Sequence, residues 1–196
     1  MIRNQIKPAI VMTIVLTVVT GFIYPIAVWA VAQVVFPAQA DGSIVMRDGH
    51  PIGSALIGQN FSGDKYFHPR PSAAGDKGYD AANSGGSNLG PTNKALIDAV
   101  RKRVAAEAKL DGPIAKSGVP VDIVTTSGSG LDPEITPAAA ELQVARIARV
   151  RGIDEGAVRA IVRQNTRRRW AGVLGEPGVN VLGANLALDD AAKTSR

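Results

Sequence analysis

The chain has 196 residues, of which 45% are hydrophobic and 20% charged, with a formal net charge of +5. This composition excludes an intrinsically disordered protein, which combines low hydrophobicity with high net charge. The absence of cysteine excludes disulfides, zinc–thiolate sites and thiol nucleophiles. The positive balance is small for the length, so we expect no nucleic-acid partner.

The apolar content is concentrated near the N-terminus, where no charged residue lies between Lys7 and Asp41. A bilayer core is about 30 Å thick and needs about 20 apolar residues in a helix. We therefore predict a transmembrane helix over 8–36, with its core at about 10–35, because an isolated span satisfies its backbone in lipid only as a helix. The alternative is a signal peptide cleaved after the Ala-Gln-Ala at 38–40, which would release a secreted protein such as a hydrolase. The apolar run is about twice as long as a signal-peptide core, which favours retention.

The charges that flank the span predict its orientation. Arg3 and Lys7 precede it, whereas Arg47 is the only Lys or Arg in the segment 41–64. Because cytoplasmic flanks carry the excess of Lys and Arg, residues 1–7 are expected in the cytoplasm. The remainder of the chain is then expected on the opposite, periplasmic face.

Within the span, Thr13, Thr17 and Gly21 recur at a spacing of four residues and share one face of the helix. Small residues at this spacing allow another membrane helix to approach closely. These three residues are candidates for helix packing. The alternative is that Thr and Gly are merely common in transmembrane helices.

Residues 37–52 are expected to form a linker that leads into one soluble domain over 53–196. The segment up to Gly90 is rich in Gly, Ser, Asn and Pro, which predicts short strands joined by long loops. Further strands are predicted at 119–125, 179–182 and 186–188.

Three amphipathic helices are predicted in the domain. The first follows Thr92 and carries an apolar stripe at 96–108, the second begins at Thr136 and ends at Gly152, and the third is capped by Asp154. Since strands and helices alternate, the predicted fold class is a single N-terminal transmembrane helix plus one soluble α/β or α+β domain.

Motifs of known chemistry are missing. The chain has no GxxxxGK[ST] phosphate loop, and its two histidines, His50 and His68, have no third ligand in sight, so we predict no metal site. Ser72, Ser127 and Ser129 lack the G-x-S-x-G elbow of serine hydrolases. We therefore predict no catalytic residues.

The most distinctive short stretch is Ser127-Gly128-Ser129-Gly130. Glycine allows backbone amides to turn toward an anion, and the helix predicted just beyond adds a positive dipole end, so the stretch could hold a phosphate. The alternative is a tight strand-to-helix connection in which glycine supplies positive φ angles.

A short basic cluster, Arg167 to Arg169, precedes Trp170. An aromatic among arginines is typical of anion or nucleic-acid patches. The alternative is a solvated helix end, where cations complement the helix dipole.

Five blocks resemble, in order, the KdpC family of the bacterial Kdp potassium-transporting ATPase. They are GSALIGQNF (53–61), YFHPRPSAA (66–74), GGSNLGPTN (85–93), VTTSGSGLDPEITPAAAELQVARIARVRG (124–152) and VNVLGANLALD (179–189). The chain departs from the family pattern at Glu134, where His or Asn is frequent, and at the arginines 167–169.

The resemblance implies an accessory, non-catalytic subunit of an inner-membrane complex that takes up potassium at the expense of ATP. Its implied partners are a potassium-channel-like subunit, a P-type ATPase subunit and a small single-helix subunit. The family is described as a catalytic chaperone that raises the ATP affinity of the ATPase subunit, and Ser127 to Gly130 are associated with that role.

The family description conflicts with the predicted orientation. About 30 Å of hydrocarbon would separate a periplasmic domain from cytosolic ATP. We therefore expect no tightly bound cofactor and an effect on ATP affinity only through the complex, by allostery. The alternative is a cytoplasmic domain that binds the nucleotide directly.

Overall fold

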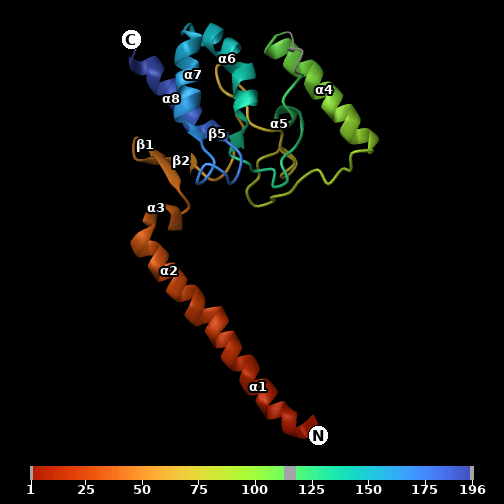
Figure 1. Cartoon of the computed structure of the whole chain (residues 1–196), viewed down its shortest axis with the longest axis vertical. Coiled ribbons are helices and arrows are strands. Elements are labelled where there is room, and N and C mark those ends of the chain that lie inside the picture. The colour runs from red at the N-terminus through yellow and green to blue at the C-terminus, as the bar shows by residue number, and fades with distance from the viewer. Residues whose placement is uncertain (1, 113–117, 195–196) are drawn as a thin grey trace. The chain divides into compact units, whose positions relative to one another are not determined.

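The N-terminal part of the chain is one long helix in three consecutive segments (Figure 1). The computed structural model describes residues 2–112 and 118–194. The segments are α1 (Ile2–Val18), the π-helical turn η1 (Val19–Ile23) and α2 (Tyr24–Val35). Together they provide a helix, Arg3–Val35, that is long and apolar enough to cross a membrane, and none of its most apolar window is buried.

The π-helical turn in the middle of the span follows from Pro25. Proline has no N–H, and its ring clashes with the carbonyl four residues earlier, here that of Gly21. The turn widens in response, and the backbone N–H of Tyr24 bonds to the carbonyl of Val19, five residues back.

The candidate packing face crosses this wide turn. Thr13 and Thr17 lie in α1, whereas Gly21 lies in η1. The Thr13 hydroxyl donates to the carbonyl of Ala9 at 2.9 Å, so its polar group is satisfied within its own helix. A Cβ atom at Gly21 would meet nothing within 4 Å, so this chain itself would accommodate a larger residue there.

The chain divides into two compact units, Met1–Ile52 and Gly53–Arg196. After the long helix come α3 (Pro37–Ala40), β1 (Ile44–Arg47) and β2 (His50–Ser54), and the last two form a two-stranded sheet. The residues between the strands, Asp48 and Gly49, both have positive φ angles, 51° and 79°, as a two-residue hairpin turn requires.

The second unit combines helices with a small antiparallel sheet. Its elements are α4 (Lys94–Leu110), α5 (Val121–Val124), β3 (Glu134–Ile135), α6 (Pro137–Arg151), α7 (Glu155–Gln164), β4 (Thr166–Arg167), β5 (Gly178–Asn180) and α8 (Val181–Thr194). β5 is the central strand and pairs with β3 and β4. The predicted fold class, a single transmembrane helix plus a soluble mixed α/β domain, is therefore confirmed.

The core lies where α6, α7 and α8 pack side by side against the sheet, whereas α4 lies at the edge of the domain away from α8 (Figure 1). The largest fully buried apolar side chains come from α6, α7, α8, the sheet and the loop before α4. They are Phe67, Ile135, Val144, Ile147, Val158, Val179 and Leu188. α4 contributes no buried residue and touches the core through half-buried Val100 and Val104.

The helices predicted from capping signals are confirmed for α6 and α7. Thr136 accepts a hydrogen bond from the N–H of Ala139, Gly152 ends α6 with φ +66°, and Asp154 accepts from Ala157. The cap predicted for α4 is wrong by one residue, because Asn93 rather than Thr92 accepts from the N–H of Ala95.

Two predicted strand regions are wrong. The β-branched run at 119–125 contains the one-turn helix α5, in which the N–H of Thr125 bonds to the carbonyl of Val121 at 2.9 Å. The run at 179–182 is strand only up to Asn180, and 186–188 lies inside α8. The helix begins this early because the Asn180 side chain accepts a hydrogen bond from the N–H of Gly183 at 2.8 Å and so caps α8.

Candidate functional site

The glycine-rich stretch lies between α5 and β3, so the predicted strand-to-helix setting is wrong. Ser127 and Gly130 are buried, whereas Gly128 and Ser129 are exposed. Of the two glycines only Gly130 has a positive φ, at 68°. A Cβ atom there would lie 2.6 Å from the carbonyl oxygen of Gly85, so glycine is required for close packing as well as for its backbone angle.

Hydrogen bonds tie this stretch to the long loop that precedes α4. The carbonyl of Ser129 accepts from the hydroxyl of Ser84 at 2.9 Å and from the N–H of Gly85 at 2.8 Å. The Ser72 hydroxyl donates to the carbonyl of Gly130 at 2.6 Å. The Ser129 hydroxyl accepts from the N–H of Leu131 at 3.1 Å. These contacts give the stretch a structural role, and nucleotide binding by Ser127 to Gly130 stays a prediction.

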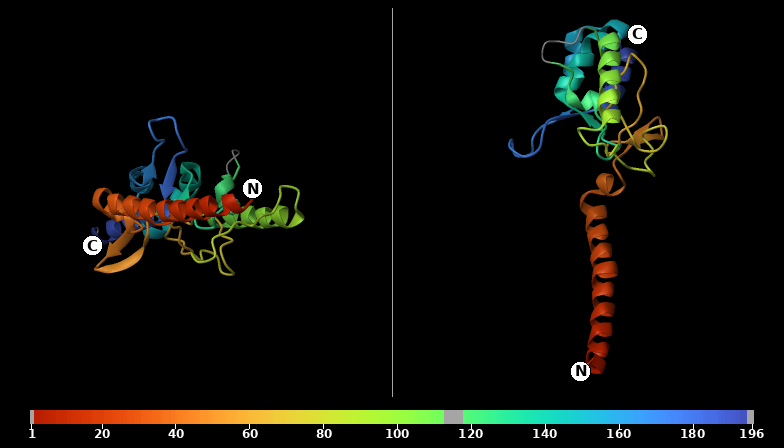
Figure 2. Two further views of the ribbon diagram at one scale, coloured as in Figure 1. Left: turned by 90° about the horizontal axis from the view of Figure 1, so that it is seen from below. Right: turned by 90° about the vertical axis from the view of Figure 1, so that its right-hand side faces the viewer.

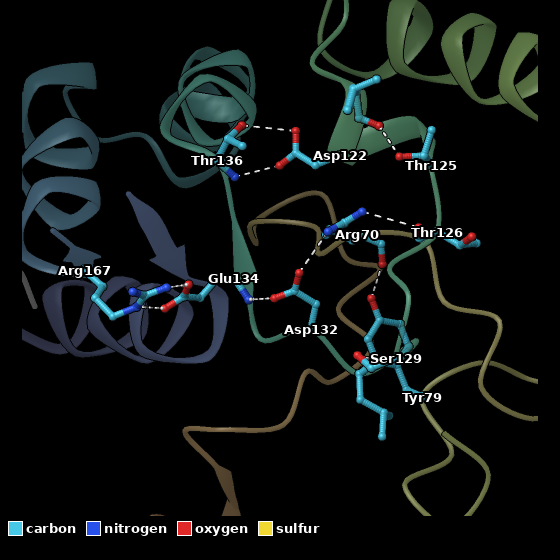
Figure 3. Close-up of polar contacts among 12 residues, drawn as sticks. Arg70, Tyr79, Asp122, Thr125, Thr126, Ser129, Asp132, Glu134, Thr136 and Arg167 are labelled. Carbon is cyan, nitrogen blue, oxygen red and sulfur yellow. Dashed lines mark hydrogen bonds and ion pairs between the residues drawn. The ribbon is translucent and has the colours of Figure 1, made fainter. Parts of the chain in front are cut away.

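An ion pair lies beside the same stretch (Figure 3). Arg70 donates to the carboxylate of Asp132 at 3.0 Å and to the carbonyl of Thr126 at 3.3 Å, and so bridges the two sides of the stretch. The other carboxylate oxygen of Asp132 accepts from the N–H of Glu134 at 3.0 Å. The hydroxyl of Tyr79 donates to the carbonyl of Arg70, and burial raises the pKa of Tyr79.

The N-terminus of α6 is capped by groups of the domain itself. Asp122, buried in α5, accepts from the N–H of Thr136 at 2.6 Å and from its hydroxyl at 3.1 Å (Figure 3). The Thr136 hydroxyl in turn accepts from the N–H of Ala139 at 3.1 Å. A carboxylate therefore already occupies the position beside the positive end of the helix dipole.

A hollow of about 370 Å³ opens beside this cluster, between the loop 60–79 and α4. Three cationic side chains, Arg70, Lys77 and Arg103, line it together with His68 and Glu107. Arg103 donates to the carbonyl of Val124 at 3.0 Å, which ties α4 to α5. Three cations against one carboxylate make this hollow positive on balance, as a site for a small anionic ligand requires.

A buried arginine, Arg146, connects the elements that border the hollow. Arg146 of α6 is 1% exposed, and its Nε donates to Asp111 at 2.7 Å, just beyond the end of α4. The same guanidinium donates to the carbonyls of Asp64 and Tyr66 and, at 2.7 Å, to the side chain of Gln143. One side chain thus joins α6, the end of α4 and the loop before His68.

Glu107 titrates near neutral pH. Burial, then its hydrogen bond to Asp111 and the charge of that carboxylate, raise the pKa of Glu107 from 4.5 to about 7. The folded chain therefore holds a proton that the unfolded chain releases, so the contribution of Glu107 to stability is full below pH 4.5 and is lost as the pH rises to about 7. Burial and the charge of Arg146 lower the pKa of His68, which favours its neutral form.

The two departures from the family pattern contact each other. Arg167 donates to Glu134 through two nitrogens, at 2.8 and 2.6 Å (Figure 3). Arg169 donates to Glu176 at 2.9 and 2.7 Å. α7 ends at Gln164, so the interpretation of 167–169 as a helix end is wrong. Arg167 lies in β4 instead, and Arg168 and Arg169 follow that strand.

Sequence reasoning missed the groups that build this site. These groups pair with residues far away in the chain, and no local sequence pattern predicts such pairs. They are Arg70, Asp111, Asp122, Asp132 and Arg146. Only Arg146 carries a signal, because it lies beside Ile147 on the face of α6 that fills the core. Among the residues that the structure describes, no group of three or more His, Asp or Glu side chains is placed to hold a metal ion.

These features define a class of protein: a membrane-anchored domain whose glycine-rich loop is hydrogen-bonded to other loops of the same domain. The pattern of the KdpC family, described as K+-transporting ATPase, c chain, matches residues 6–190. The potassium-transporting ATPase KdpC subunit of Polaromonas naphthalenivorans is 55% identical over 95% of each chain. The protein of the same name from Rhodopseudomonas palustris (strain BisB5) is 56% identical over 95% of this chain and 96% of the relative.

A third relative, from Rhodospirillum rubrum, carries the same name and is 56% identical over 95% of this chain and 96% of its own. The chain therefore belongs to the KdpC family, the c chains of K+-transporting ATPases. The resemblance inferred from the five sequence blocks is confirmed.

Proposed function

We propose that this chain is an accessory, non-catalytic subunit of a potassium-transporting ATPase in the inner membrane. Its N-terminus is cytoplasmic, and its domain lies on the opposite face. The chain stabilises the assembly and acts on ATP affinity only by allostery. The span and the domain contact the channel-like, P-type ATPase and single-helix subunits that the family resemblance implies.

One observation carries the proposal that the domain works without touching ATP. Several polar groups of the Ser127–Gly130 stretch are used inside the domain: two carbonyls accept from Ser72, Ser84 and Gly85, the Ser129 hydroxyl accepts from the N–H of Leu131, and the N–H of Ser127 donates to the carbonyl of Pro71 at 3.4 Å. A phosphate-binding loop instead presents its backbone N–H groups to the ligand. The flanking charges of the span support the same conclusion from topology.

The second candidate is a cytoplasmic domain that binds a nucleotide directly. Its support is the hollow lined by Arg70, Lys77 and Arg103, whose charges suit a phosphate. The two candidates differ in the side of the membrane on which the domain lies, and the chain contains no cysteine that would complicate labelling.

Cysteine labelling from one side of the membrane tests the orientation. Ala105 is exposed on α4 and lies outside the hollow, and Asn4 is exposed before the span. In intact cells, a maleimide that passes the outer but not the inner membrane should label Ala105→Cys and spare Asn4→Cys. Opening the inner membrane should make both reactive. The reverse pattern would place the domain in the cytoplasm and favour the second candidate.

The packing face of the span is tested by Gly21→Leu. The chain itself has room for the larger side chain, since a Cβ at Gly21 meets nothing within 4 Å. Loss of co-purification with the other subunits would therefore report a clash with a partner helix. We expect at least about a tenfold loss, equivalent to about 1.4 kcal/mol. Leu16→Ile, which keeps the volume of a residue outside the Thr13–Thr17–Gly21 face, is the control. Normal assembly of Gly21→Leu would exclude this face from the contact.

A further inference from the structure

The connection between β4 and β5 contains a closed turn with exposed apolar side chains. Trp170 and Leu174 exchange two backbone hydrogen bonds, at 2.8 and 3.0 Å, around Ala171 and Gly172, which both have positive φ angles. The side chains of Trp170, Val173 and Leu174 are 73%, 72% and 58% exposed. Both views of Figure 2 show this connection, drawn in blue, projecting from the body of the domain. We call Trp170 to Leu174 the apolar tip.

Two arginines near the base of the apolar tip, Arg163 and Arg168, have no acidic partner among the residues that the structure describes. Arg167 and Arg169 pair with Glu134 and Glu176. Because successive side chains of an extended segment point to opposite sides, Arg168 faces away from those carboxylates. It lines a hollow of about 350 Å³ together with Arg163 of α7.

The charge in this hollow is positive on balance. Its other ionic residues are Arg159 and Glu141, which pair with each other at 2.7 Å, and Arg159 also pairs with Glu155. Arg163 and Arg168 are thus the two cations left to meet an external anion. Two exposed guanidinium groups that line one hollow suit the phosphates of lipid headgroups.

We propose that the apolar tip docks on the surface of an anionic bilayer. Trp170, Val173 and Leu174 enter the interfacial region, where tryptophan is enriched, and Arg163 and Arg168 bind headgroup phosphates. The chain's own span keeps the domain tethered to a bilayer, so docking is an intramolecular event that succeeds with modest contact energy. A stable protein interface buries about 800 Å² per partner, more than a three-side-chain tip provides by itself.

Fluorescence of a single tryptophan tests the proposal in the full chain. The chain has two tryptophans, and Trp29→Phe in the span leaves Trp170 as the only one. This variant is reconstituted into phosphatidylcholine vesicles with and without about 30% phosphatidylglycerol, an anionic lipid, with lipids brominated on their acyl chains as quenchers. We expect brominated lipid to quench Trp170 in the anionic vesicles, and acrylamide in the water to quench it less there than in neutral vesicles.

The arginines are tested by Arg163→Gln with Arg168→Gln in the same background. Each arginine near an anionic surface contributes about 1 kcal/mol, so the ratio of docked to undocked domain should fall about 30-fold for the pair. Arg101→Gln with Lys102→Gln removes the same charge from the exposed face of α4 and should change nothing.

Three results would overturn the proposal. Trp170 could stay as open to acrylamide in anionic as in neutral vesicles. Its quenching by brominated lipid could be the same with and without the two arginines. Finally, Trp170 could become shielded only when the other subunits are present, without quenching by brominated lipid, which would assign the apolar tip to a protein surface.

Discussion

Replacing Arg146 by methionine should lower the free energy of unfolding of the domain by about 3–5 kcal/mol, the usual result of breaking a buried ion pair. Methionine fills most of the volume, but Asp111 is left buried without its counter-ion. The carbonyls of Asp64 and Tyr66 also lose their donor. Urea unfolding of the full chain in detergent, followed by circular dichroism, measures the change.

The matched control is Arg159→Met. Arg159 pairs with Glu141 and Glu155 at the surface, where its side chain is 41% exposed. Water screens such pairs, so this variant should cost less than about 1 kcal/mol. Equal costs for Arg146→Met and Arg159→Met would contradict the role assigned to the buried network.

The second large effect is expected within the glycine-rich stretch, where two glycines differ in their surroundings. Gly130→Ala forces a Cβ to within 2.6 Å of the Gly85 carbonyl and 2.8 Å of Ala74, in a backbone with φ +68°. Overpacking and the left-handed backbone together should destabilise the domain by about 2–4 kcal/mol. A methyl group added at Gly128 would meet no neighbour within 4 Å, and the φ angle there is ordinary, so Gly128→Ala should change stability by less than about 0.5 kcal/mol.

The same pair of variants separates structure from nucleotide binding. If the stretch acts only as a scaffold, Gly128→Ala should leave the ATP affinity of the assembled pump unchanged. A tenfold loss of affinity in Gly128→Ala, with assembly intact, would instead indicate that the exposed part of the stretch contacts the nucleotide. Titration of ATPase activity against ATP concentration provides the measurement.

Helix boundaries were predictable where a local signal marks them. Thr136, Gly152 and Asp154 act through hydrogen bonds or backbone angles within a few residues, so sequence alone indicates them. Thr92 and Asn93 are both competent caps, and neighbouring signals of equal strength do not decide between them. The long apolar span was predictable for a different reason, because length and charge distribution suffice.

The strand errors show where local preference is overridden. The run around Val121 is β-branched, which favours a strand. Asp122 nevertheless accepts hydrogen bonds from the N–H and the hydroxyl of Thr136, and the helical turn of α5 brings its carboxylate within reach of both groups. In the same way Asn180 ends β5 and caps α8, which buries Ala184 and Leu188 at helical spacing. The first outcome depends on a contact 14 residues away, which no local pattern contains, whereas the second depends on a local cap at Asn180 that the strand interpretation of 179–182 overlooked.

The candidate site, too, was predictable where its signal is local and not where it depends on distant pairs. Its glycine-rich stretch stands out in the sequence, and the positive φ of Gly130 accords with one of the two interpretations of that stretch. The pairs Arg70–Asp132 and Arg146–Asp111 join residues separated by 62 and 35 positions. Only the folded chain brings them together.

The shallow attachment of α4 has a consequence for local opening. α4 has no buried residue, and it is held by half-buried Val100 and Val104, by Arg103 and by the Asp111–Arg146 pair at its end. Its amide hydrogens should therefore exchange with solvent far sooner than those of α6, through an excursion that leaves the core intact. Glu107 makes this excursion easier above about pH 7, where its proton is gone. The hollow beside α4 is thus bounded on one side by a helix that we expect to detach more readily than α6.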